Sequence, residues 1–211
     1  MQRSLVKRVG YGALHVATRL ACTLFFRVRV FGRENMPNTS GALVCSNHQS
    51  FLDPLLIGLA LDRRCNFLAR ESLFRNWLFK GVIRFLDAIP IDRERSGFAG
   101  LRETLNRLKS NELVLIFPEG TRTPNGALQP LKPGFCSVAR RSGQPLLPVA
   151  FDGAFQAWPR SHLLPQPSPI HIVIGKPIMP EEVAALNDAE LIAELERRMQ
   201  TCFALARKTL G

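Results

Sequence analysis

Residues 42–61 read ALVCSNHQSFLDPLLIGLAL, and this stretch indicates the fold class. It opens with a short apolar run, continues through a polar segment and ends in an apolar stretch that begins at Asp53 and Pro54. A short apolar run of this kind predicts a buried strand. Asp at the N-cap followed by Pro at the first helical position predicts the start of a helix. We therefore expect a strand, a polar loop and a helix in succession.

The same alternation continues along the chain. Apolar runs at 112–117 and 145–151 predict buried strands, and residues 97–110 and 134–143 predict helices between them. Further strands are expected in 27–35, 64–70, 88–92 and 169–178, the last near an edge because of its prolines. Further helices are expected at 76–86 and 181–208. The pattern predicts an α/β fold: a single domain over residues 28–211, with a largely parallel or mixed sheet flanked by helices.

The length of the chain and its net positive charge limit the classes of function that it could have. A chain of 211 residues with 46% hydrophobic residues can bury a full core. The net charge is +11, and residues 1–110 hold 18 basic against 8 acidic residues. This balance indicates an anionic partner such as a membrane surface, a phosphorylated substrate or nucleic acid. A nucleic-acid-binding module is disfavoured, because the chain has one Tyr and no recognisable zinc-finger or helix-turn-helix signature.

Residues 1–27 form the expected N-terminal segment. On a helix, Leu5, Val9 and Val16 fall on one side and Arg8 and Arg19 on another. A basic amphipathic helix of this type is expected to lie in the membrane interface, although the same periodicity also fits a helix packed on the domain's own core. The uncharged run at 20–26 is too short to span a bilayer, and we expect no signal peptide.

The cysteines and histidines are dispersed. No pair of the five cysteines has CxxC spacing, and the four histidines do not cluster with them. We expect reduced thiols, mostly in the core, and no metal site.

His48 and Asp53 are the candidate catalytic pair. An imidazole can take a proton from an attacking hydroxyl, and a carboxylate can fix its tautomer and stabilise the imidazolium. The alternative is a loop histidine beside an ordinary helix cap. No GxSxG nucleophile motif is present, and Ser50 lacks its strand–turn–helix setting. A base without a protein nucleophile favours direct attack by the substrate's own hydroxyl.

Two further polar loops follow apolar strands, and such loops meet at the carboxyl edge of a parallel sheet. FPEGTR at 117–122 supplies Glu119, Gly120 and Arg122, with Arg122 suited to phosphate. IPIDR at 89–93 supplies Arg93, and LKPGF at 131–135 supplies Lys132, both candidate anion contacts. A surface turn with a Glu–Arg pair and a solvated strand end are the alternatives for the first two loops.

The combination of NHQSFLD, AIPIDR, FPEGTR and PLLPVAF, in this order, resembles the four sequence blocks of the glycerolipid acyltransferases, and especially bacterial 1-acyl-glycerol-3-phosphate acyltransferases. The resemblance covers about residues 25–180. It implies that His48 is the base and Asp53 its orienting carboxylate in the HxxxxD motif. It also implies that acceptor binding involves Arg93, Glu119, Gly120, Thr121 and Arg122, whereas Pro148 belongs to a block linked to acyl binding or architecture. Ala88 and Pro90 stand where the second block often has Gly and Phe, which bears on acceptor identity.

The activity implied by the resemblance is acyl transfer from acyl-CoA or acyl-carrier protein to the free hydroxyl of lysophosphatidate, forming phosphatidate. It implies no metal and no bound cofactor. The expected location is the cytoplasmic face of the inner membrane, where a peripheral or monotopic enzyme contacts anionic lipid. The alternatives are another acceptor, such as a lyso-ornithine lipid or glycerol-3-phosphate, and a non-catalytic membrane adaptor with the same fold.

Overall fold

The structure is a computed structural model that describes residue 20 and residues 23–61, 63–70, 89–91 and 97–210. The expected helix at 76–86 and most of the N-terminal segment lie outside the described residues. The described chain contains the elements β1 (Arg29–Phe31), η1 (Arg33–Asn35), β2 (Ala42–Ser46), α2 (Asp53–Ala60), β3 (Cys65–Arg70), β4 (Ile89–Ile91), α5 (Gly97–Lys109), β5 (Leu113–Ile116), α6 (Gly134–Ser142), β6 (Leu146–Asp152), α7 (Ala154–Ala157), β7 (His171–Ile174), α8 (Pro180–Ala185) and α9 (Asp188–Leu210).

A seven-stranded sheet forms the centre of the molecule, in the order β1-β7-β6-β2-β5-β3-β4. The strands from β6 to β4 are all parallel, which confirms the predicted α/β architecture. β7 runs antiparallel to β6, and β1 runs parallel to β7, so the sheet is mixed. β7 is the second strand from one edge, which agrees with the predicted position near an edge, and β1 pairs with its outer side.

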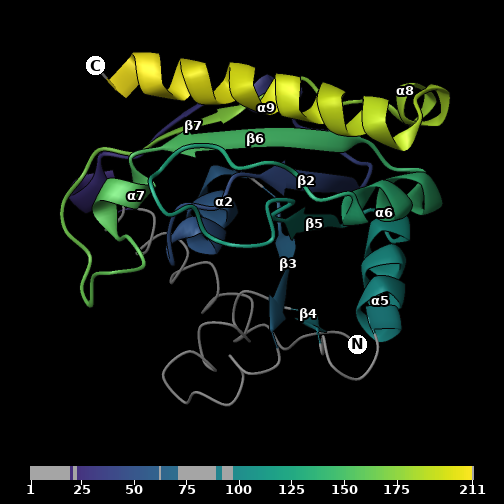
Figure 1. Ribbon diagram of the computed structural model, residues 1–211, viewed down its shortest axis with the longest axis horizontal. Coiled ribbons are helices and arrows are strands. Elements are labelled where there is room, and N and C mark those ends of the chain that lie inside the picture. The colour runs from purple at the N-terminus through teal and green to yellow at the C-terminus, as the bar shows by residue number, and fades with distance from the viewer. Residues whose placement is uncertain (1–19, 21–22, 62, 71–88, 92–96, 211) are drawn as a thin grey trace.

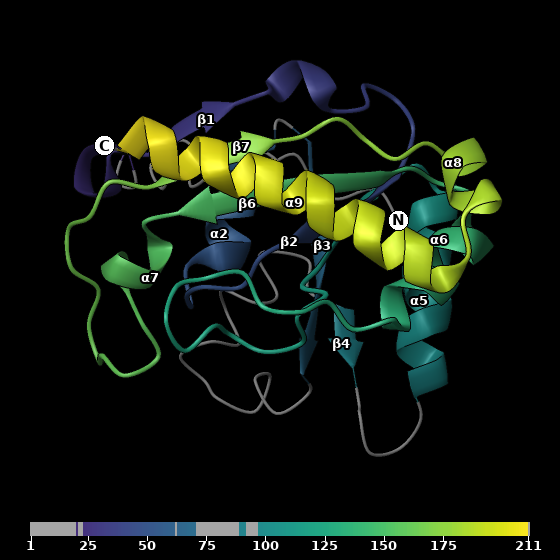
Figure 2. The same cartoon turned by 45° about the horizontal axis from the view of Figure 1, so that its top comes forward.

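Helices cover both faces of the sheet (Figures 1 and 2). A layer of buried hydrophobic side chains lies on each face. Along β2, Ala42 and Val44 pack on one side, together with α2 and α7, while Leu43 and Cys45 pack on the other, together with α6, α8 and α9. This alternation follows from the two-residue period of a strand. Buried strands with apolar residues on both faces therefore explain the continuous apolar runs in the sequence.

The C-terminal helix predicted over 181–208 is interrupted, so that prediction is wrong in its continuity. α8 ends at Ala185 and α9 begins at Asp188. Between them the Asn187 side chain accepts a hydrogen bond from Glu190 N–H, and the Glu190 carboxylate accepts one from Asn187 N–H. This reciprocal capping box starts a new helix, because it satisfies backbone donors that an uninterrupted helix would otherwise bond internally.

The four described cysteines are free thiols, and three of them, Cys45, Cys136 and Cys202, are buried. Burial raises the pKa of Cys65 to about 12 and that of Cys202 to about 11. Thiols with such pKa values carry little thiolate near neutral pH and are poor nucleophiles. Within the described ranges, no cluster of His, Cys, Asp or Glu has the geometry to hold a metal ion.

Candidate active site

Two polar loops meet at the carboxyl edge of the parallel strands. One follows β2 and contains residues 47–52, and the other follows β5 and begins at Phe117. The backbone N–H of Thr123 donates to the carbonyl of His48 at 2.7 Å, and the N–H of His48 donates to Glu119 Oε1 at 3.3 Å. Because β2 and β5 are adjacent parallel strands, loops 70 residues apart in sequence lie side by side here.

His48 and Asp53 are in direct contact. Nδ1 of His48 lies 2.7 Å from Oδ2 of Asp53, and the Asp53 side chain is fully buried. The same oxygen also accepts the backbone N–H groups of Gln49 at 2.6 Å and Ser50 at 2.8 Å. An oxygen that accepts two backbone donors favours the imidazole tautomer with its proton on Nδ1, which leaves Nε2 as the basic nitrogen.

Asp53 does not cap α2, so the predicted N-cap role is wrong. α2 starts at Asp53 itself, its N-cap residue is Leu52, and no side chain caps it. The carboxylate is turned backward, toward the backbone of the loop that precedes the helix. Burial raises the pKa of Asp53, while the hydrogen bonds from His48, Ser50 and Gln49 act in the opposite direction and favour its ionised form.

Two side chains that flank His48, Asn47 and Gln49, attach the loop to β6 and to the segments around it. The Asn47 amide donates to Phe151 O at 2.9 Å and accepts from Phe151 N–H at 3.0 Å. The Gln49 amide donates to Gly126 O at 2.7 Å and accepts from Phe155 N–H at 3.2 Å. Neither residue was predicted from the sequence. The sequence feature that could have identified them is the pair of amide side chains on either side of His48, between an apolar strand and an apolar helix.

The imidazole is contacted on one face as well as at its edge. The His48 and Phe117 rings stack at a centroid distance of 4.0 Å and an interplanar angle of 12°, and 21% of the His48 side chain remains exposed. The Ser50 hydroxyl already has hydrogen-bond partners: it donates to Trp158 O at 2.8 Å and accepts from Leu52 N–H at 3.2 Å. A partly exposed imidazole whose neighbouring Ser50 hydroxyl is already hydrogen-bonded suits a reaction in which the nucleophile belongs to the substrate.

Glu119 is a buried carboxyl beside His48. It is 2% exposed, and burial raises its pKa to about 8. One oxygen accepts the His48 N–H, whereas Oε2 has no hydrogen-bond partner among the residues that the structure describes. A buried carboxyl with a raised pKa is protonated near neutral pH and can donate a hydrogen bond.

Gly120 and Lys132 are close neighbours. Gly120 has φ +73°, and a Cβ placed there would lie 3.0 Å from Lys132 Nζ. The Lys132 N–H donates to Pro118 O at 2.9 Å, which attaches the two ends of the loop to each other. A glycine at this position therefore permits both the left-handed backbone and the approach of an ammonium group.

Arg122 extends toward the loop that carries His48. Its guanidinium carbon lies 3.6 Å from the centroid of the Phe51 ring, a cation–π contact. Thr121 is exposed beside it. The structure thus brings His48, Asp53, Glu119 and Arg122 to one edge of the sheet, with Gly120, Thr121 and Lys132 on the same loop. Arg93 lies outside the described residues.

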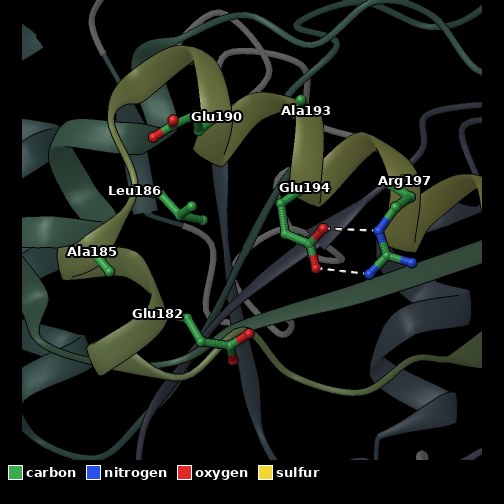
Figure 3. A pocket seen from close by; sticks show the side chains of 7 residues that line it. All are labelled: Glu182, Ala185, Leu186, Glu190, Ala193, Glu194 and Arg197. Atoms are coloured by element: carbon green, nitrogen blue, oxygen red, sulfur yellow. Dashed lines mark hydrogen bonds and ion pairs between the residues drawn. The ribbon is translucent and has the colours of Figure 1, made fainter.

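A hollow between α8 and α9 lies on the opposite face of the sheet from α2 (Figures 1 and 3). Its lining includes Glu194 and Arg197, which pair at 2.8 Å, and Glu194 also pairs with Arg198 at 2.6 Å. These ion pairs lower the pKa of Glu194 to about 2. A carboxylate that is already paired with two guanidinium groups is not poised for proton transfer, so this hollow is a poor candidate for acid–base chemistry.

Comparison with known proteins agrees with this geometry. The sequence model of the acyltransferase family matches residues 27–152. A Bacillus subtilis protein named 1-acyl-sn-glycerol-3-phosphate acyltransferase is 29% identical, over 85% of this chain and 87% of that protein. A Pseudomonas aeruginosa protein of the same name is 32% identical, over 87% of this chain and 69% of that protein.

A solved structure is also similar. The crystal structure of the 1-acyl-sn-glycerophosphate acyltransferase PlsC from Thermotoga maritima aligns with a TM-score of 0.78 and 26% identity, over 95% of this chain and 82% of that one. The family match includes β2, β5 and β6 and the loops that hold His48 and Glu119. The chain therefore belongs to the acyltransferase family.

Proposed function

We propose that this enzyme transfers a fatty acyl group from a thioester donor to the free hydroxyl of 1-acyl-glycerol-3-phosphate, forming phosphatidate. The observation that carries the proposal is the His48–Asp53 contact of 2.7 Å in a loop that Glu119 also contacts. The relatives named above act, by their names, on the same acceptor. The donor is acyl-CoA or acyl-carrier protein.

In the proposed reaction, Nε2 of His48 removes the proton from the acceptor hydroxyl as its oxygen attacks the thioester carbonyl. The new C–O bond forms, the C–S bond breaks, and the proton on Nε2 passes to the leaving thiolate. Asp53 keeps the proton on Nδ1 and stabilises the imidazolium formed between these steps. General-base catalysis of this kind contributes about 10²–10⁴-fold to a rate.

The acceptor phosphate is proposed to bind the basic groups at this edge of the sheet. Arg122 carries the planar donor fork that matches phosphate oxygens, and the Lys132 ammonium lies beside Gly120. Arg93 is proposed as a further phosphate contact from its place in the sequence. Thr121 and protonated Glu119 are proposed to hydrogen-bond acceptor oxygens. Such contacts would hold the acceptor hydroxyl near His48 and convert binding into orientation.

Both the acceptor and the product are lipids, so we propose that the enzyme works at an anionic membrane surface. No described helix is both long enough and apolar enough to cross a bilayer. The basic residues of the segment 1–27 are proposed to bind anionic lipid on the cytoplasmic face of the inner membrane. The same excess of positive charge attracts the phosphates of CoA or the acidic carrier protein.

The test is acyl transfer in mixed micelles, with labelled acyl-CoA and acyl-carrier protein as donors and lysophosphatidate as acceptor. Wild type is expected to form phosphatidate, and His48→Ala is expected to abolish it. Asp188→Asn is a control carboxylate on the surface of α9, remote from the dyad. Transfer to another lysolipid or to glycerol-3-phosphate but not to lysophosphatidate would refute the acceptor assignment. Full activity of His48→Ala would refute the mechanism.

A further inference from the structure

The loop between α7 and β7 presents two adjacent leucines to solvent. Leu163 is 94% exposed and Leu164 is 78% exposed, in the stretch PRSHLLPQPSP at 159–169. Figures 1 and 2 show this green loop extending away from the sheet beyond α7. Transfer of two such apolar side chains from water to an apolar environment lowers the free energy, because it removes apolar surface from water.

The base of the loop is held by hydrogen bonds. Trp158 Nε1 donates to His162 O at 3.0 Å, and Gln166 N–H donates to Ala157 O at 2.8 Å. The Gln166 side-chain amide also donates to Gln156 O at 2.8 Å. Because these bonds join the two sides of the loop, the leucine tip is presented on an ordered support.

Exposed apolar side chains concentrate at this end of the described chain. Among the residues that the structure describes, nine large apolar side chains are exposed, and six of them lie in three segments that meet here: Leu20, Leu24, Phe25, Phe51, Leu163 and Leu164. Ile170 N–H donates to Phe26 O at 3.0 Å, which joins the helical residues 23–26 to the end of the loop. The Phe51 and Trp158 rings lie 5.4 Å apart, which joins the loop to the segment that carries His48.

The charge around the leucines is positive. No acidic residue occurs between Asp152 and Glu181, whereas Arg160 and Lys176 lie in that interval. Arg160 is exposed three residues before Leu163. Apolar side chains with nearby cations match the boundary between lipid headgroups and acyl chains of an anionic bilayer.

We infer that the 159–169 loop is a membrane-contacting element, with Leu163 and Leu164 inserting into the acyl-chain boundary and Arg160 lying at the level of lipid phosphates. The loop gives the active-site edge a second contact with lipid, separate from the segment 1–27. The inference rests on the proposed function and extends it, because it names the residues that contact the membrane. A protein partner fits poorly, because a stable interface buries about 800 Å² on each side and this convex tip offers two leucines.

Vesicle sedimentation tests the inference without any measurement of catalysis. Wild type, Leu163→Ser/Leu164→Ser and the control Leu205→Ser would be compared on phosphatidylglycerol and phosphatidylcholine vesicles at one salt concentration. Leu205 is an exposed leucine of α9 and serves as the matched control. The double variant is expected to partition about tenfold more weakly, equivalent to about 1.4 kcal/mol, while Leu205→Ser partitions as wild type does. Circular dichroism would verify that all three proteins are folded.

Brominated lipids provide a second measurement. In a Trp77→Phe background, Trp158 is the only remaining tryptophan, and it lies at the base of the loop. Its fluorescence is expected to be quenched by vesicles brominated on the acyl chains, and less so in the Leu163→Ser/Leu164→Ser variant.

Equal vesicle binding by folded wild type and double variant would overturn the inference, as would equal quenching of Trp158 in the two proteins. A wild-type oligomer that the double variant converts to a monomer, with vesicle binding unchanged, would also overturn it, because the leucines would then mediate self-association. Failure of wild type to transfer acyl groups would refute the proposed function alone, since sedimentation does not depend on turnover.

Discussion

Replacing Glu119 by Gln should change how stability depends on pH. Burial raises the pKa of Glu119 to about 8, whereas a glutamate in an unfolded chain titrates near about 4.3. Between these values the native state holds a proton that the unfolded chain has released. The contribution of Glu119 to stability is therefore fully present below the unfolded pKa and is lost as pH rises toward 8.

The size of the effect follows from the two pKa values. From pH 6 to pH 9 the unfolded chain is ionised throughout, while native Glu119 changes from protonated to largely ionised. The free energy of unfolding should then fall by about 2–3 kcal/mol over this interval because of this one group. Gln keeps the shape and the acceptor oxygen for His48 N–H but has no proton to lose, so this part of the pH dependence should vanish.

The assay is urea unfolding at pH 6, 7, 8 and 9 for wild type, Glu119→Gln and the exposed control Glu181→Gln. Other titrating groups contribute equally to all three proteins, so the difference from wild type isolates Glu119. The control should follow the wild-type profile, and Glu119→Gln should become relatively more stable as pH rises. Parallel profiles for wild type and Glu119→Gln between pH 6 and 9 would show that native Glu119 does not hold its proton above pH 6.

Four other substitutions, one of them a control, test three separate features. Asp53→Asn should reduce acyl transfer by about 10²–10⁴-fold in the micelle assay, because it removes the charge that stabilises the imidazolium; activity near that of wild type would contradict the dyad. Gly32→Ala should destabilise by more than about 2 kcal/mol in urea, because Gly32 has φ +75° and its added Cβ would clash with Ile174 O. Gly58→Ala is its control and should stabilise by about 0.5–1 kcal/mol, since the added Cβ meets no described atom within 4 Å beyond its chain neighbours and the backbone of α2 itself. Asn187→Ala should cost about 1 kcal/mol by removing the cap of α9, and an unchanged unfolding midpoint would argue against the capping box.

The sequence by itself was sufficient to predict the fold class and the edge of the sheet at which the candidate site residues meet. Continuous apolar runs, separated by amphipathic helices, can be buried only in a sheet covered on both faces, and β2, β5 and β6 have that arrangement. The spacing from His48 to Asp53 also allowed a contact to be predicted, because four intervening residues form one turn of chain at the start of a helix. These are local properties, set by side-chain period and by short-range geometry.

Tertiary structure decided the features that depend on partners distant in sequence. The orientation of β7 and β1 follows from pairing across the sheet, which periodicity does not encode. Asp53 does not cap α2, because its carboxylate instead accepts hydrogen bonds from two backbone N–H groups of the preceding loop. The raised pKa of Glu119, the attachment of Asn47 to β6 and the exposure of Leu163 likewise require knowing which distant residues surround each group. Desolvation, long-range hydrogen bonding and exposure are properties of the packed molecule, so no stretch of the sequence contains them on its own.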